Sequence, residues 1–221
     1  MNAAALLHLL QFASPALPIG GYSYSQGLEA AIEQGKVTDA DTARAWIASY
    51  LHQVMATWDA PLLWRLMAAF ARGDDAAVAL WSERFIASRD TFEFRAESIQ
   101  MGYSLVRLVQ ELGVADVSAL GDEVALPTAF ACAVSALDIP PADALVAWLF
   151  SWAENQVLVC VKSVPLGQVA GQRLLLSLTD DIDAAASDAQ GILDDAMSNW
   201  APGLSMLSMQ HEVQHGRLYR S

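Results

Sequence analysis

Lysine is almost absent from this 221-residue chain, where only Lys36 and Lys162 occur. The chain has 12 Lys and Arg side chains and 25 Asp and Glu side chains, so its formal net charge is −13. A surface of this sign repels phosphate backbones and anionic lipid, because both are negatively charged. The composition therefore disfavours nucleic-acid binding.

No apolar run is long enough to span a bilayer, which takes about 20 residues. The longest near the middle, residues 144–153, ends at Glu154. The first ten residues are apolar but contain no Lys or Arg, and Pro15 and Pro18 follow where a signal peptide would need its cleavage site. We therefore expect a cytoplasmic protein without a membrane span.

Cysteines and charged residues are both few. Cys132 and Cys160 form no C-x-x-C pair and lie in apolar helical patterns, so we expect reduced, buried thiols. Only 17% of the residues are charged, whereas 54% are hydrophobic. This excess of apolar side chains indicates burial in a core or against other chains, and we expect partners.

Apolar residues recur at helical spacing along the chain, between clear start and stop signals. Ser23 with Gln26, and Thr38 with Asp41, have the spacing of helix-start capping boxes. Short apolar runs at 157–161 and 174–178 would also fit strands, but no alternating hairpin accompanies them. We predict an all-α chain, a single compact domain over residues 1–221, with around ten helices at about 23–34, 38–58, 61–73, 75–86, 101–112, 127–137, 141–161, 166–178 and 181–197 and from about 203.

Near the end, HEVQH at residues 211–215 matches the H-E-x-x-H pattern of zinc hydrolases. On a helix, His211 and His215 would share one face, and Glu212 could act as general base on a metal-bound water. No His, Asp, Glu or Cys follows to supply the usual third ligand. A zinc-dependent hydrolase is therefore a minor alternative.

Three other features have simpler explanations. The glycines at 167 and 171 lack the strand and the Lys of a phosphate-binding loop, so close helix packing explains them better. Trp200, beside a Pro-Gly pair, is the tryptophan we expect at an interface. Six carboxylates match no calcium loop and fit a solvated helix face, namely Asp180, Asp181, Asp183, Asp188, Asp194 and Asp195.

Four blocks in order along the chain resemble the UreF family of urease accessory proteins. They are SPALPIGGYSYSQGLE at 14–29, VKSVPLGQ at 161–168, GQR at 171–173 and HEVQHGRLYRS at 211–221. The family tail has Tyr at the position of His215, Ser at that of Gly216 and Phe at that of Tyr219. The resemblance thus makes the second histidine of the zinc pattern a local substitution.

The resemblance implies an all-helical maturation factor that is not an enzyme. It would form a homodimer, bind UreD (UreH in some organisms) and recruit the GTPase UreG to apo-urease for nickel insertion, with a role in gating GTP hydrolysis. Nickel and GTP would be handled by the partners, and this chain would hold no cofactor. The implied partner-binding residues are Pro15, Pro18, Gly20, Gly21, Ser23, Gln26, Glu29, Lys162, Gln168, Gln172, Arg173, His211, Glu212, Arg217, Leu218, Tyr219 and Arg220.

Some expectations concern particular segments. The run 89–95 departs from the more charged run that the resemblance implies, and its Phe92 and Phe94 should make that surface more apolar. Removing residues 217–221 should leave the fold intact and abolish UreD binding. Whether the tail, about 203–221, is ordered only when a partner is bound is left open. A helical scaffold unrelated to urease is the remaining alternative.

Overall fold

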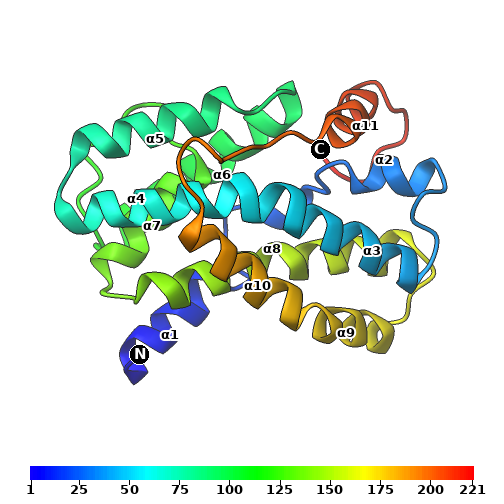
Figure 1. Cartoon of the computed structure of the whole chain (residues 1–221), viewed down its shortest axis with the longest axis horizontal. Coiled ribbons are helices and arrows are strands. Elements are labelled where there is room, and N and C mark those ends of the chain that lie inside the picture. Colours follow the sequence, from blue (N-terminus) through cyan, green and yellow to red (C-terminus); the bar gives the residue numbers. More distant parts are fainter.

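The computed structural model describes all 221 residues and contains helices but no strands, which confirms the predicted all-α fold class (Figure 1). The elements in chain order are α1 (Ala3–Phe12), the 3₁₀ turn η1 (Gly21–Ser23), α2 (Leu28–Glu33), α3 (Ala40–Tyr50), the π-helical segment η2 (Leu51–Asp59), α4 (Ala60–Arg72), α5 (Asp75–Ala87), α6 (Phe92–Glu111), α7 (Leu126–Ala136), α8 (Pro141–Ser163), α9 (Gln168–Ser177), α10 (Thr179–Gly191) and α11 (Pro202–Glu212).

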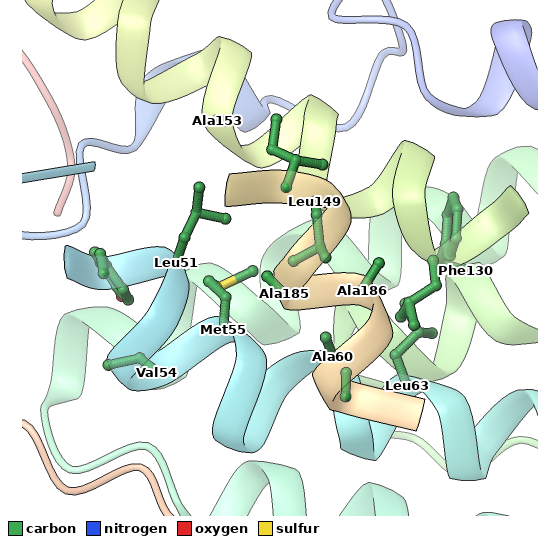
Figure 2. Packing of buried hydrophobic residues seen from close by; sticks show 14 of the residues in the cluster. Leu51, Val54, Met55, Ala60, Leu63, Phe130, Leu149, Ala153, Ala185 and Ala186 are labelled. Atoms are coloured by element: carbon green, nitrogen blue, oxygen red, sulfur yellow. The ribbon is translucent and has the colours of Figure 1, made fainter. Parts of the chain in front are cut away.

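Helices α3 and α4 are joined through η2 into one unbroken rod, which α8 and α10 pack against. Figure 2 shows Ala185 and Ala186 of α10 beside Met55 and Ala60 of the rod, with Leu149 of α8 close by. Small alanine side chains let the α10 backbone approach the rod closely. The interior is one continuous hydrophobic cluster of 51 buried residues, as expected for a single core.

Most predicted starts and stops are found in the structure. Pro61 lies in the first turn of α4, and Gly73 ends that helix in the left-handed conformation. Asp74 caps α5 by accepting a hydrogen bond from the backbone N–H of Ala77 at 3.0 Å. The apolar runs at 157–161 and 174–177 are helical, in α8 and α9. Two predicted bounds are wrong, because α10 ends at Gly191 and not at 197, and α6 starts at Phe92 and not at 101.

The predicted helix start at Ser23 is wrong. Residues 21–23 form only the turn η1, and α2 begins at Leu28. Gln26 has a φ of 55° and Gly27 a φ of 80°, so the backbone is left-handed where a capping box would need helix. The second start signal is displaced by one residue, because Asp39 and Thr42 form the capping box of α3.

The two phenylalanines of the 89–95 run have different environments. Phe92 is 76% exposed, whereas Phe94 is buried on the inner face of α6. The expectation that both enlarge the apolar surface is therefore wrong for Phe94. Both cysteines are free and buried, as predicted, and burial raises the pKa of the Cys160 thiol to about 12.

Helix α8 has the length and apolar composition that a membrane crossing would need. In this structure it is a core helix that buries Leu145, Leu149 and Ala153 against its neighbours. Figure 1 shows α1 projecting from the body at the N-terminal end, whereas the C-terminus returns to lie beside α2 and α11.

Candidate functional site

The N-terminal loop and the end of the chain lie side by side. Arg220 donates its backbone N–H to the carbonyl oxygen of Ser23 at 2.8 Å. The backbone N–H of Ser25 donates to the carbonyl oxygen of Ser221 at 2.8 Å, and the Ser25 hydroxyl donates to the same oxygen. Ser25 and Ser221 are 196 residues apart in sequence, so this contact joins the first and last family blocks.

Glu29 lies beneath this tail and is only 7% exposed. Its Oε1 accepts a hydrogen bond from the backbone N–H of Leu218 at 2.7 Å, and its Oε2 accepts one from Tyr219 at 3.0 Å. Buried backbone donors need partners, and this carboxylate supplies them. Glu29 therefore holds the tail by its main chain, independently of the tail's side chains.

His211 is fully buried between two carboxylates. Its Nδ1 is 2.7 Å from Oε2 of Glu93, and its Nε2 is 2.9 Å from Oε2 of Glu29. Both ring nitrogens are therefore engaged by carboxylates. Arg217 adds a cation, with its Nη1 2.6 Å from Oε1 of Glu93.

The zinc pattern does not form a site in this structure. Helix α11 ends at Glu212, so His215 lies beyond it and is exposed, while His211 points into the interior. No group of three or more His, Cys, Asp or Glu side chains is arranged to hold a metal ion. Glu212 accepts a hydrogen bond from the backbone N–H of Phe92 at 3.0 Å, at the start of α6. The Glu212 carboxylate thus caps the N-terminus of α6, and this role accounts for an acidic residue at position 212.

Glu97, one turn beyond Glu93 on α6, is the most buried carboxylate of the cluster, at 2% exposure. Its Oε2 accepts a hydrogen bond from the Ser221 hydroxyl at 2.6 Å, and its Oε1 accepts one from the Gln26 amide. The carbonyl oxygen of Gln26 accepts in turn from the Trp152 indole at 2.6 Å. Burial raises the pKa of Glu97 to about 7, although both hydrogen bonds oppose that shift.

Lys162 joins this region from the second family block. It lies in the last turn of α8, and its Nζ is 5.9 Å from the centroid of the Tyr219 ring. The lysine is exposed and belongs to none of the ion pairs of the structure. The α8 terminus therefore presents a free cation next to the tail.

The remaining predicted residues are not brought into this cluster by any hydrogen bond or ion pair. Gln168, Gln172 and Arg173 are exposed on α9. Gly171 is a packing residue, since a Cβ there would lie 2.5 Å from Cγ2 of Val161, and this supports close helix packing as the explanation for that glycine.

The rest of the predicted set lies in the loop before α2. Pro15 and Pro18 are exposed. Gly20 has a φ of 79°, which favours glycine at that position. Gly21 begins the turn η1.

Where the tail crosses α6, the surface is hollowed. The hollow has a volume of about 480 Å³ and is lined by Tyr24, Phe92, Glu93, Ala96, Glu97, Gln100, Glu212, Arg217 and Arg220. Burial raises the pKa of the Tyr24 hydroxyl, and interaction with Arg220 partly offsets it. We call this feature the tail hollow.

The sequence reasoning missed Ser25, Glu93, Glu97 and Trp152 as parts of the cluster. A signal for two of them was present, because Glu93 and Glu97 are four residues apart and so share one face of α6 with the buried Phe94 and Met101. Acidic residues on an apolar helix face indicate buried partners.

Comparison with known proteins identifies the family of the chain. The model of the UreF family matches residues 37–179. The chain is 63% identical to the urease accessory protein UreF of Janthinobacterium sp. (strain Marseille), with all of both chains covered. It is 57% identical to the UreF of Nitrosospira multiformis, with 98% of each chain covered, and 50% identical to that of Azoarcus sp. (strain BH72), with 98% of this chain and 95% of the relative covered. The chain belongs to the UreF family of urease accessory proteins.

Proposed function

We propose that this chain serves urease maturation as a cytoplasmic, non-catalytic scaffold that binds UreD and recruits the GTPase UreG to apo-urease for nickel insertion. The role in maturation follows from membership of the family. The finer assignment is supported by one observation: the loop, the α8 terminus and the tail, which carry three of the four family blocks, meet on one surface.

The chemistry of this surface favours docking over catalysis. His211 has both ring nitrogens engaged by carboxylates, and Glu212 caps α6. These groups support the tail and leave neither residue free as a general base. We therefore propose that nickel and GTP are handled by the partner proteins.

The exposed side chains near the tail are of the kind that dominate protein interfaces. Leu218 is 74% exposed, Phe92 is 76% exposed and Tyr22 is 59% exposed. Arg220 is also exposed and lines the tail hollow. Aromatic and arginine side chains with an apolar neighbour are typical hot spots, so we place the UreD contact here.

Lys162 is the residue we assign to the GTPase contact. A free cation beside this surface suits a carboxylate or phosphate of a partner. Helix-terminus stabilisation is the competing role, worth about 0.3 to 1 kcal/mol.

We also propose that the chain acts as a homodimer, whose mass light scattering can measure.

The test is co-purification of tagged chain with UreD and UreG, followed by nickel-dependent urease activation. Leu218→Ala should lower UreD recovery about tenfold, as expected for a hot spot. Leu176→Ala is the matched control, because Leu176 is 75% exposed on α9, away from the tail. Lys162→Ala should still co-purify with UreD and should melt at the temperature of the parent, but it should change GTP turnover in the assembled complex.

Two results would contradict the proposal. Equal UreD recovery with Leu218→Ala and Leu176→Ala would remove the tail from the contact. A lowered melting temperature with normal GTP turnover in Lys162→Ala would return that lysine to a structural role.

A further inference from the structure

A second surface feature lies apart from the tail hollow, where the connection between α10 and α11 passes over the α3–η2 rod. It is a groove of about 450 Å³ whose lining includes Lys36, Trp46, Tyr50, Trp200 and Met206. We call it the Trp200 groove. None of its lining residues belongs to the loop at 14–29, to α8 or to residues 211–221.

Trp200 is held in place but uncovered. The backbone N–H of Ser198 donates to the carbonyl oxygen of Thr57 at 3.0 Å, and the Thr57 hydroxyl donates to the carbonyl oxygen of Ser198 at 2.6 Å. The Asn199 amide donates to the carbonyl oxygen of Ser88 at 2.8 Å. Although its two preceding residues are fixed, the Trp200 side chain is 80% exposed. A rigidly presented, exposed tryptophan is the usual anchor of a protein contact.

The groove differs in charge from the rest of the surface. Lys36 is exposed and takes part in no ion pair. No carboxylate lines the groove, although the chain as a whole carries a net charge of −13. The groove is thus a locally cationic site on an acidic protein.

The segment beneath the groove has unusual geometry. Gln53 and Val54 of its lining belong to η2, a nine-residue π-helix. π-helical turns are rare and occur frequently at functional sites. The wider turn belongs to the rod that the groove overlies, so it helps to shape the groove floor.

We infer that the Trp200 groove binds a short acidic segment of a partner protein, with an apolar side chain against Trp200 and a carboxylate facing Lys36. Charge complementarity selects the acidic class, since Lys36 is the only charged residue in the lining. The inference does not depend on the partners proposed for the tail.

The experiment uses the full chain and two short acetylated, amidated peptides. Both carry the same leucine and phenylalanine side chains, and they differ in having glutamates or lysines at the remaining positions. Binding is measured by fluorescence anisotropy, and fluorotryptophan labelling reports which tryptophan senses the peptide. The glutamate peptide should bind saturably and shift the Trp200 signal, which Trp200→Phe assigns.

Variants make the test specific. Trp200→Ala should weaken binding of the glutamate peptide about tenfold or more. Lys36→Glu should reverse the preference toward the lysine peptide, whereas Arg72→Glu, which makes the same charge change at the end of α4, should leave the preference unchanged. Both variants alter exposed residues, and circular dichroism checks that each one is folded.

Four outcomes would overturn the inference. They are equal binding of both peptides, equal weakening by Lys36→Glu and Arg72→Glu, no saturable binding by the parent, and a Trp200 signal that shifts with protein concentration alone. The last outcome would assign the groove to a second copy of this chain.

Discussion

At the residue scale, Glu97 is the most deeply buried carboxylate of the cluster. Burial raises its pKa from an ordinary value of 4.5 to about 7, so the folded state favours the neutral carboxyl. Between these two values the folded chain binds more protons than the unfolded chain. The free energy of unfolding should therefore fall as pH rises through this window.

Glu97→Gln should remove this pH dependence, because glutamine is neutral at every pH and keeps an acceptor for Gln26 or Ser221. At about pH 5 the variant and the parent should melt at similar temperatures. At about pH 8 the variant should be more stable, by about 1 to 3 kcal/mol. Thermal melts across this range measure the effect.

The matched control is Glu111→Gln, on the same helix but with a side chain that is 67% exposed. It should follow the parent at every pH. A parent whose stability does not fall between about pH 5 and pH 8, relative to Glu97→Gln, would show that Glu97 titrates normally.

At the element scale, the crossing of α6 and α7 depends on one glycine. A Cβ on Gly102 would lie 2.0 Å from the carbonyl oxygen of Val124 and 2.8 Å from the backbone nitrogen of Leu126. These are backbone atoms at the start of α7 and just before it, so no side-chain rotation can relieve the overlap. The contact fixes how closely α7 approaches α6, and through them the position of Glu93 and Glu97.

Gly102→Ala should therefore destabilise the fold by about 3 kcal/mol, the upper part of the range for overpacking. Gly203→Ala is the control, since Gly203 is also helical and has no atom within 4 Å of its Cβ position. That change should be neutral or slightly stabilising. Urea denaturation of the two variants should give well-separated midpoints, and coincident midpoints would show that α7 can shift freely.

At the scale of the whole molecule, the tail closes the structure by pairing with segments far away in sequence. It supplies hydrogen-bond partners for Ser25, Glu29, Glu93 and Glu97. The sequence suggested that removing residues 217–221 would leave the fold intact. The contacts lead to a different expectation, because deletion leaves buried carboxylates without their donors.

Deletion of residues 217–221 should lower the free energy of unfolding by about 3 kcal/mol or more, because three buried carboxylates, Glu29, Glu93 and Glu97, lose hydrogen-bond donors. Leu218→Ala should cost little, since that side chain is 74% exposed. Denaturant titration of both variants beside the parent measures the difference. An unchanged midpoint in the deletion variant would mean that the tail is not a structural part of the isolated chain.

The sequence by itself determined the fold class, most helix bounds and the family. Apolar spacing and the Pro, Asp and Gly signals of α4 and α5 act within a few residues, so they can be read locally. The family blocks are also local patterns, and together they identify the UreF resemblance that the relatives confirm.

Only the tertiary structure decided what the residues singled out by the sequence patterns do. Ser23 fails as a helix start because Gln26 bonds to Glu97 and Trp152 instead of closing a capping box. His211 looks like a metal ligand in sequence, yet it lies between Glu29 and Glu93, 182 and 118 residues away. The role of a polar side chain is set by which groups surround it once water is excluded, and those groups come from distant parts of the chain.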